Sequence, residues 1–220
     1  YTSEFAGTWV VTGTVDGLAD TAILNVNADC SNAVRFELTP DGATVIAGET
    51  QVYTATAYDA AGNPCDVTGE AIFTTGDPCG NFAGGNNIYQ ACQMGTHRQV
   101  AIWNDWHADA LVYVEHAEAI RIDIDPDDAI VRSGEILTYT VTAFDGFDDN
   151  QWDVTVGSTF TSTDPLGGFV SNDYTGGQEG DWTQTATYNG LTDSTGVTVV
   201  HGDAVEVDVQ PDPETVTAGE

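Results

Sequence analysis

The sequence contains no lysine, and its only strong cations are four arginines set against 35 aspartates and glutamates. The resulting formal net charge of −31 repels nucleic acid phosphates and anionic lipid, so we expect neither as a partner. Carboxylates at this density also repel one another over roughly 10 Å unless salt or divalent cations screen them. The acidity therefore points to a saline or cation-rich exterior or, equally, to a large surface protein that is kept soluble.

Long apolar stretches are also missing. No run approaches the ~20 residues that span a membrane, so we expect no membrane insertion in this window, and no signal peptide is present. No stretch keeps helical periodicity beyond a turn or two. Hydrophobic residues still make up 41% of the chain, which predicts a folded protein rather than a disordered one.

Motifs for catalysis are absent as well. The sequence has no G-x-S-x-G, and its histidines are scattered at His97, His107, His116 and His201. Nucleophilic catalysis therefore has no support. A repeated module offers no single cleft for a pair of catalytic carboxylates, so we do not expect an enzyme.

What the sequence does contain is an internal repeat with a period near 86 residues. Its fixed points are three prolines and three glycines at matching spacings: Pro40, Pro126, Pro211, Gly48, Gly134 and Gly219. In chain order the parts are the C-terminal part of a repeat (1–33), a complete repeat (34–119), a second complete repeat (120–204) and the first strand of a further repeat (205–220).

We expect this sequence to be a window from a longer array. The alternative is a self-contained subunit in which the head at 204–220 completes the tail at 1–33 of a neighbour by strand addition. Those two pieces together lack the equivalent of 50–75, which makes strand exchange the less favoured arrangement.

Each repeat opens with strict alternation of apolar and polar residues, typical of a half-buried antiparallel strand. The apolar positions are Val34, Phe36 and Leu38 in the first complete repeat and Ile120, Ile122 and Ile124 in the second. Further alternating segments follow, separated by turn residues. About seven short strands per repeat predict an all-β fold of tandem immunoglobulin-like β-sandwiches. A closed barrel is the alternative, but head-to-tail repetition favours separate domains.

The segments 38–68 and 124–145 follow the motifs I-x-P-x4-V-x-A-G-E and Y-T-x-T-A-x-D, with Leu38 in place of the isoleucine and Ser133 in place of the alanine, and the first copy adds G-N and D-V-T. They resemble the bacterial and archaeal immunoglobulin-like (Big-type) tandem repeats of invasin-type adhesins and surface-layer proteins. The resemblance implies an extracellular, cell-surface array that serves as stalk, lattice or adhesin. The lack of lysine is similar in composition to proteins of salt-adapted archaea.

Four cysteines, at positions 30, 65, 79 and 92, fall at or within the first complete repeat. An even number in an apparently extracellular chain predicts two disulfides with three possible connectivities. We favour Cys79 with Cys92, which closes a loop rich in glycine and asparagine, and Cys30 with Cys65, which staples the linker between repeats. A zinc site is the rival interpretation, but the sequence has no C-x2-C and no Cys/His pairing.

Aspartate-rich turns are the candidate cation sites. Calcium binds six to eight oxygens from such loops and could rigidify the joints of an array. The spacing does not match an EF-hand, and solvated turns are the alternative in a chain this acidic. The candidate ligands are Asp145, Asp148, Asp149 and Asn150 in a turn, and Asp125, Asp127 and Asp128 in a linker.

Trp9 and Trp182 share one late-strand position, where we expect core residues, whereas the middle copy has Arg98 there. Nearby aromatic residues could form an exposed patch for a glycan or a neighbouring chain. The alternative is that they fill the core of their own repeat. The residues of this candidate patch are Trp103, Trp106, His107 and Tyr113.

Two functions are consistent with these features. The first is a structural segment of an extracellular surface-layer, sheath or filament protein, whose partners are copies of itself and possible bound calcium ions. The second is an adhesin stalk, or a set of accessory domains that bind a glycan or host surface.

Overall fold

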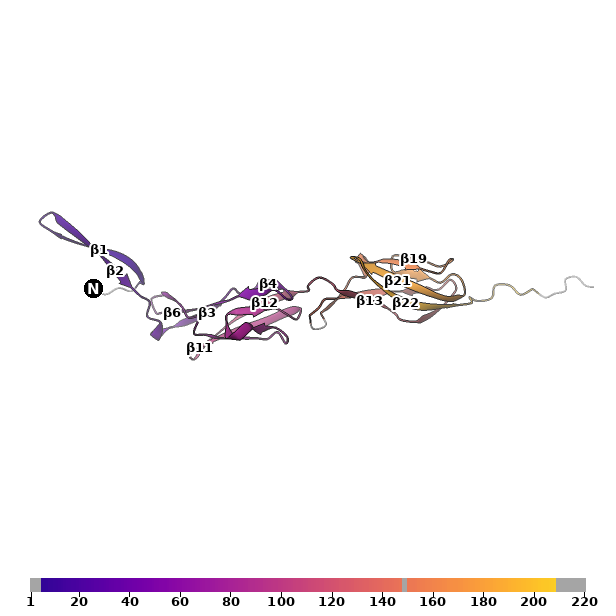
Figure 1. Ribbon diagram of the computed structural model, residues 1–220, viewed down its shortest axis with the longest axis horizontal. Helices are drawn as coiled ribbons and strands as arrows, with labels where there is room; N and C mark the ends of the chain where they lie inside the picture. The colour runs from indigo at the N-terminus through magenta and orange to yellow at the C-terminus, as the bar shows by residue number, and fades with distance from the viewer. Residues whose placement is uncertain (1–4, 148–149, 209–220) are drawn as a thin grey trace, which may run out of the picture. The chain divides into compact units, whose positions relative to one another are not determined.

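The computed structural model describes residues 5–147 and 150–208. The chain forms two compact units, one of Tyr1–Glu118 with Asp145–Asn150 and the other of Ala119–Phe144 with Gln151–Glu220. The predicted boundary between the complete repeats, at 119 and 120, lies next to the division at Glu118 and Ala119. The elements described are β-strands and short 3-10 turns (Figure 1).

Besides an N-terminal two-stranded hairpin, the described residues of the first unit form three sheets that make up a sandwich. The largest has the strand order β4-β12-β11-β8, and the others are β3-β6-β7 and β5-β10-β9. Strand β4 pairs parallel with β12, and the remaining pairs are antiparallel. The strands are β3 (Arg35–Thr39), β4 (Ala43–Ile46), β5 (Thr50–Val52), β6 (Thr54–Tyr58), β7 (Pro64–Asp66), β8 (Ile72–Thr75), β9 (Asn81–Phe82), β10 (Ile88–Gln90), β11 (Gly95–Trp103) and β12 (Trp106–Glu115), with 3-10 turns η1 (Cys30–Asn32) and η2 (Ala83–Gly85).

The second unit repeats this topology, with sheets β14-β22-β21-β18, β13-β16-β17 and β15-β20-β19. Strand β14 again pairs parallel with β22. The predicted tandem immunoglobulin-like sandwich is therefore confirmed. Its strands are β13 (Arg121–Asp125), β14 (Ala129–Arg132), β15 (Ile136–Thr138), β16 (Thr140–Phe144), β17 (Gln151–Asp153), β18 (Thr159–Ser162), β19 (Gly168–Val170), β20 (Asp173–Thr175), β21 (Gly180–Tyr188) and β22 (Leu191–Val200), with a 3-10 turn η3 (Thr155–Gly157).

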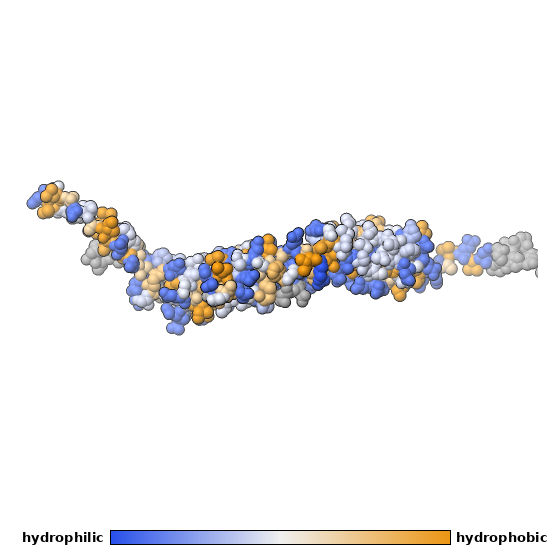
Figure 2. Space-filling view, viewed as in Figure 1, coloured by the Kyte–Doolittle hydropathy of each residue, from blue (hydrophilic) through white to orange (hydrophobic). Residues whose placement is uncertain are grey.

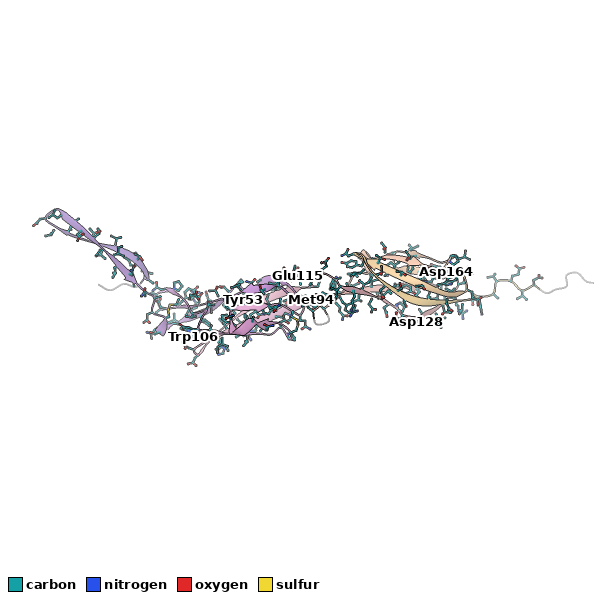
Figure 3. All side chains as sticks on the ribbon, viewed as in Figure 1. Tyr53, Met94, Trp106, Glu115, Asp128 and Asp164 are labelled. Carbon is teal, nitrogen blue, oxygen red and sulfur yellow. A yellow bond between two sulfur atoms is a disulfide. The ribbon has the colours of Figure 1, made fainter. Side chains whose placement is uncertain are left out.

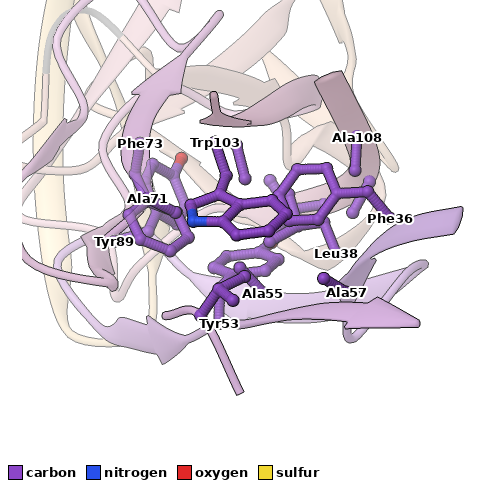
Figure 4. Close-up of a cluster of buried hydrophobic side chains, with 14 of the residues drawn as sticks. Phe36, Leu38, Tyr53, Ala55, Ala57, Ala71, Phe73, Tyr89, Trp103 and Ala108 are labelled. Carbon is purple, nitrogen blue, oxygen red and sulfur yellow. The ribbon is translucent and has the colours of Figure 1, made fainter. Parts of the chain in front are cut away.

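Each unit has its own hydrophobic core, built from the inward-facing residues of its strands. In the first unit Phe36 and Leu38 pack with Tyr53 and the indole of Trp103, as Figure 4 shows. Tyr53 and its counterpart Tyr139 are fully buried. Burying an aliphatic or aromatic side chain of this size stabilises the fold by roughly 1.5–3 kcal/mol, so these positions carry much of the core energy.

The alternation predicts three buried apolar residues in the opening strand of each repeat, and this prediction is wrong for the first of the three. Val34 and Ile120 remain exposed because they precede β3 and β13, which begin at Arg35 and Arg121. Their backbone N–H groups already donate to the carbonyls of Tyr58 and Phe144, but their side chains lie outside the core. Each core also encloses a fully buried glutamine, Gln99 or Gln184, whose side-chain amide bonds to no residue in the described part of the chain.

The N-terminal residues form a two-stranded hairpin of β1 (Gly7–Val15) and β2 (Leu18–Val26). The prediction of Trp9 as a core residue is wrong, since it is 42% exposed and no third strand covers the hairpin in the described residues. Its counterpart Trp182 is half-buried against the second core. In the predicted strand at 205–220, Val205 and Val207 are exposed outside any strand, and 209–220 lie outside the described residues.

Candidate functional site

A buried carboxylate organises one end of each sandwich. In the first unit Asp77, which follows β8, accepts hydrogen bonds from the Tyr89 hydroxyl at 2.5 Å and from the backbone N–H groups of Cys92 at 2.9 Å and Gln93 at 3.1 Å. Asp77 is 3% exposed. The carboxylate thus ties three segments of the unit together: the end of β8, strand β10 and the chain that leads into β11.

The second unit contains the same arrangement around Asp164, labelled in Figure 3. Its carboxylate accepts from the Tyr174 hydroxyl at 2.6 Å, Gly177 N–H at 2.8 Å and Gln178 N–H at 3.1 Å. A Cβ added at Gly167 would overlap this carboxylate, as one at Gly80 would overlap Asp77. The repeated D-P-x-G sequence therefore encodes the site: the aspartate is the acceptor and the glycine leaves room for it.

Hydrogen bonding controls the charge of both carboxylates. Burial alone would raise the pKa of Asp77, but the bonds from Tyr89, Gln93 and Cys92 outweigh burial and hold the pKa below its ordinary value. The same balance holds the pKa of Asp164 far below its ordinary value. Both groups are thus fixed acceptors rather than proton-transfer groups. Sequence reasoning missed them, although D-P-x-G occurs at the same place in both copies.

A second polar cluster in the first unit is formed by the segment Asp145–Asn150. The Asn150 amide oxygen accepts from Met94 N–H at 2.6 Å, and its nitrogen donates to the Cys92 carbonyl at 3.0 Å. Asp145 accepts from Ala117 N–H at 2.8 Å. Asp145 and Asn150 are 6% and 3% exposed, and a Cβ at Gly48 would overlap the Phe147 ring. Asp145, Phe147 and Asn150 are therefore built into the end of the first sandwich.

The preceding repeat boundary uses the same contact. Asn63 accepts from Ala6 N–H at 2.8 Å and donates to Asp59 at 2.8 Å. Ala6 directly precedes Gly7 of β1, just as Met94 directly precedes Gly95 of β11. An aspartate–asparagine turn therefore binds the amide before the long hairpin at two successive places along the chain. We call this contact the asparagine joint.

The candidate calcium ligands are not gathered into one site in the described residues. Asp145 and Asn150 are engaged in the asparagine joint, whereas Asp148 and Asp149 lie outside the described residues. The assignment of Asp125, Asp127 and Asp128 to a linker is wrong: Asp125 ends β13, and Asp127 and Asp128 lie in the turn to β14 inside the second unit, because the chain enters the sandwich before this segment. All three are exposed. No group of three or more His, Cys, Asp or Glu placed to hold a metal occurs in 5–147 and 150–208. Calcium binding stays a prediction.

Two disulfides join the cysteines, Cys30 to Cys65 with Cα atoms 6.1 Å apart and Cys79 to Cys92 with Cα atoms 5.5 Å apart. These are the two pairs favoured from the sequence. Cys79 and Cys92 flank the Asp77 carboxylate, whose hydrogen bonds include the Cys92 N–H. The second unit forms the same carboxylate site with Leu166 in the place of Cys79 and without a disulfide.

The candidate aromatic patch does not form as one surface. Trp103 is 7% exposed and donates to Glu70 at 2.9 Å, so it belongs to the core. Trp106 is 37% exposed next to the turn between β11 and β12, and His107 beside it is exposed. Tyr113 is 44% exposed but pairs with Thr96 at the opposite end of the hairpin. Successive residues of a strand point to opposite faces of the sheet, and Trp106 and Tyr113 lie toward opposite ends of β12. The four side chains therefore do not share one surface.

Tyr113 instead borders a shallow groove of about 520 Å³ at the end of the β11–β12 hairpin. Met94 and Glu115, both labelled in Figure 3, lie on its walls. His116 also lines it, and His97 is nearly buried, with Nε2 2.6 Å from the Gln93 carbonyl oxygen. The groove lining combines the apolar side chains of Met94 and Val114 with the single carboxylate of Glu115.

No helix in the described residues is long and apolar enough to cross a membrane. Comparison of the sequence with protein-family models and with curated proteins gives no match. Among solved structures, the chain is similar to the surface layer protein SbsC, domains 1-6, with 21% identity and a TM-score of 0.36 over 89% of this chain and 32% of that one. The chain thus spans about a third of that structure.

Two further solved structures give similar values. Sidekick-1 immunoglobulin domains 1-4 match 90% of this chain and 59% of that one at 12% identity, with a TM-score of 0.33. PcdhgB3 EC1-4 matches 84% of this chain and 54% of that one at 12% identity, with a TM-score of 0.39.

Proposed function

We propose that this chain is a structural segment of an extracellular surface-layer, sheath or filament protein built of tandem immunoglobulin-like domains. The observation that carries the proposal is the asparagine joint, which recurs at Asn63 and Asn150 with the same kind of backbone partner. A contact that recurs at the same position of successive repeats is typical of an array built from one repeated unit, in which each repeat uses the same local contacts.

The charge and the disulfides support an extracellular setting. Disulfides persist in oxidising compartments, and this chain has two. The net charge of −31 keeps neighbouring copies apart until salt or divalent cations screen it. Assembly in this proposal therefore depends on the ionic strength of the exterior, and its partners are further copies of the same protein.

Electron microscopy of the native assembly tests the proposal. We expect an ordered sheet, tube or fibre in which the domain repeat is visible. Micrographs that show only isolated rods, over a range of salt and calcium concentrations, would rule out the structural role.

A second function, glycan or surface binding in an adhesin, is favoured by one observation. Trp106 is 37% exposed next to the turn between β11 and β12, where its indole offers an apolar surface to a partner. Binding on a glycan array that Trp106→Ala abolishes, and that Tyr113→Ala at the other end of the hairpin leaves intact, would support this function. Trp103→Ala is unsuitable as a test because that indole is part of the core.

A further inference from the structure

The largest sheet of the first unit has an apolar outer face. Successive residues of a strand point to opposite sides of the sheet, so every second residue of β4, β12, β11 and β8 points away from the core. We call these outward residues the outer face. Ile46, Ile72, Leu111 and Tyr113 of this face are between 40% and 64% exposed. The apolar residues of the outer face are Ile46, Ile72, Val100, Ile102, Leu111 and Tyr113.

The second unit indicates that the fold does not require this apolar face. Its sheet β14-β22-β21-β18 has the same register, since Thr159 pairs with Thr187 where Ile72 pairs with Ile102. The six corresponding residues, in the same order, are Arg132, Thr159, Thr185, Thr187, Gly196 and Thr198. Figure 2 shows hydrophobic residues at the surface of the first unit, whereas the second unit is mostly pale or blue on the side in view. The apolar outer face is therefore a feature of the first unit alone among the two complete repeats.

The outer face also carries little net charge. Arg98 and Asp109 form an ion pair of 2.9 Å at its centre, and both side chains are more than half exposed. Glu115 is the third charged residue among its outward positions, so one arginine stands against two carboxylates and the face has a net charge of −1. The chain as a whole carries −31. A second, equally acidic copy therefore meets least repulsion at a surface of this kind.

The groove of about 520 Å³ lies at one end of the outer face. Thr96, Tyr113 and Glu115 belong to both, and Met94 lies beside them. Buried centres of protein interfaces are enriched in aromatic residues, methionine and arginine. The outer face offers Tyr113 and Arg98, with Met94 at its end, so its composition is that of an interface rather than of a solvated sheet.

We propose that the outer faces of two copies of this chain pack on each other. Arg98 of each copy pairs with Asp109 of the other, and the apolar residues around this pair leave water. A two-fold contact of this kind requires the same patch on both partners to be self-complementary. One donor and one acceptor at the centre of an apolar face meet that requirement, whereas nucleic acid and anionic lipid are repelled by the acidic surroundings.

The size of the face sets the strength of the contact. Strands about 4.8 Å apart, with a rise of about 3.4 Å per residue, give this four-stranded sheet an area of roughly 450 Å². Two such faces bury roughly 900 Å² in total, below the size of standard stable interfaces. The contact is therefore weak in dilute solution and effective where copies are held at high local concentration. It deepens the proposed function, on which it rests for its biological setting, by naming a contact between copies.

Sedimentation of the 220-residue chain up to millimolar concentration tests the proposal. We expect a concentration-dependent dimer that strengthens with salt, because carboxylates outside the contact repel those of the other copy. Ile72→Asp and Leu111→Asp should each raise the dissociation constant at least tenfold, since each buries an unpaired carboxylate. The matched control is Thr159→Asp, which adds the same charge at the counterpart of Ile72 and should leave association unchanged. All three side chains are exposed, so the cores are not disturbed.

A charge exchange supplies a second readout. Arg98→Asp and Asp109→Arg should each weaken self-association, because like charges then face each other across the two-fold contact. An equimolar mixture of the two variants should associate, because opposite charges then meet at both pairs. Damage to the fold of either variant could not produce this recovery.

Three outcomes would overturn the proposal. They are a chain that stays monomeric at all concentrations and salt levels, equal weakening by Ile72→Asp and Thr159→Asp, and a charge-exchanged mixture that does not associate. Ordered native assemblies together with any of these results would refute this contact while leaving the structural function standing. Dimers formed through the outer face, together with native material that shows only isolated rods, would refute the structural function and leave the contact standing.

Discussion

At the scale of single residues, the two sandwiches depend on the same buried acceptor. Asp77 and Asp164 each bind a tyrosine hydroxyl and successive backbone amides. Burial, together with this bond to a carboxylate, raises the pKa of Tyr89 and Tyr174 well above the ordinary tyrosine value, so both hydroxyls remain donors. A buried acceptor with all its partners in place is costly to remove, because the donors are then left unpaired.

We therefore predict that Asp164→Asn lowers the free energy of unfolding of the second unit by about 2 kcal/mol and leaves the first unit unchanged. The amide can accept only through its single oxygen, and its NH₂ group faces N–H and O–H donors. Differential scanning calorimetry, which resolves the two units, measures the effect. Asp123→Asn, on the exposed face of β13, is the control, and an equal loss in that variant would contradict the explanation.

The same two carboxyls predict a pH dependence. Their pKa values are depressed in the folded state, so the folded state binds protons more weakly than the unfolded state. The stability they confer is present above the ordinary aspartate pKa of about 3.9 and is lost as pH falls toward the depressed values. Urea midpoints measured from neutral to acid pH should fall less steeply below pH ~4 in Asp164→Asn than in the parent.

At the scale of elements, a disulfide closes the loop between Cys79 and Cys92 in the first unit, whereas the equivalent loop of the second unit has no disulfide. Replacing both cysteines with serine should destabilise the first unit by about 3 kcal/mol, since the crosslink no longer restricts the unfolded chain. The second unit forms the equivalent loop with Leu166 and serves as an internal control. Calorimetry that shows both transitions shifting together would count against a local effect.

The asparagine joint is the other element-scale feature. Asn150→Ala removes the acceptor of Met94 N–H and the donor to the Cys92 carbonyl, so the Met94 amide should exchange with solvent at least tenfold faster if about 1.4 kcal/mol of local stability is lost. Hydrogen exchange monitored by NMR measures this. In the matched variant Asn63→Ala, the Ala6 amide should respond and the Met94 amide should not. Unaltered exchange at Met94 in Asn150→Ala would refute the role of the joint.

At the scale of the whole molecule, the net charge of −31 makes repulsion among carboxylates the main electrostatic effect. We predict that millimolar calcium raises the thermal unfolding midpoint, because cations offset the repulsion among carboxylates and bind the aspartate-rich turns. Sodium chloride at matched ionic strength separates charge screening from calcium binding. A midpoint that rises further with calcium than with sodium chloride indicates bound calcium. A midpoint that does not change across an EDTA titration would remove the calcium proposal.

Strand positions and the two cores could be predicted from the sequence because alternation is local. Phe36 and Leu38 in β3 and Ile122 and Ile124 in β13 face inward as expected, since a strand turns every second side chain to the same face. The internal repeat predicted that the two complete copies fold alike, because the same pattern forms the same strands; which strands pair came only from the structure. The predicted burial of Trp9 was wrong because burial also requires a covering strand, which alternation within β1 does not reveal.

The sequence by itself thus determined the all-β class, the tandem division and the inward residues of each strand, all of which follow from periodicity within short segments. Only the tertiary structure decided that Trp103 is in the core while Trp106 is exposed, and that Asn150 binds the backbone of Cys92 and Met94. These contacts join residues far apart in the chain. Their partners are set by sheet register and by which turns meet at the end of a sandwich, and no local pattern encodes either.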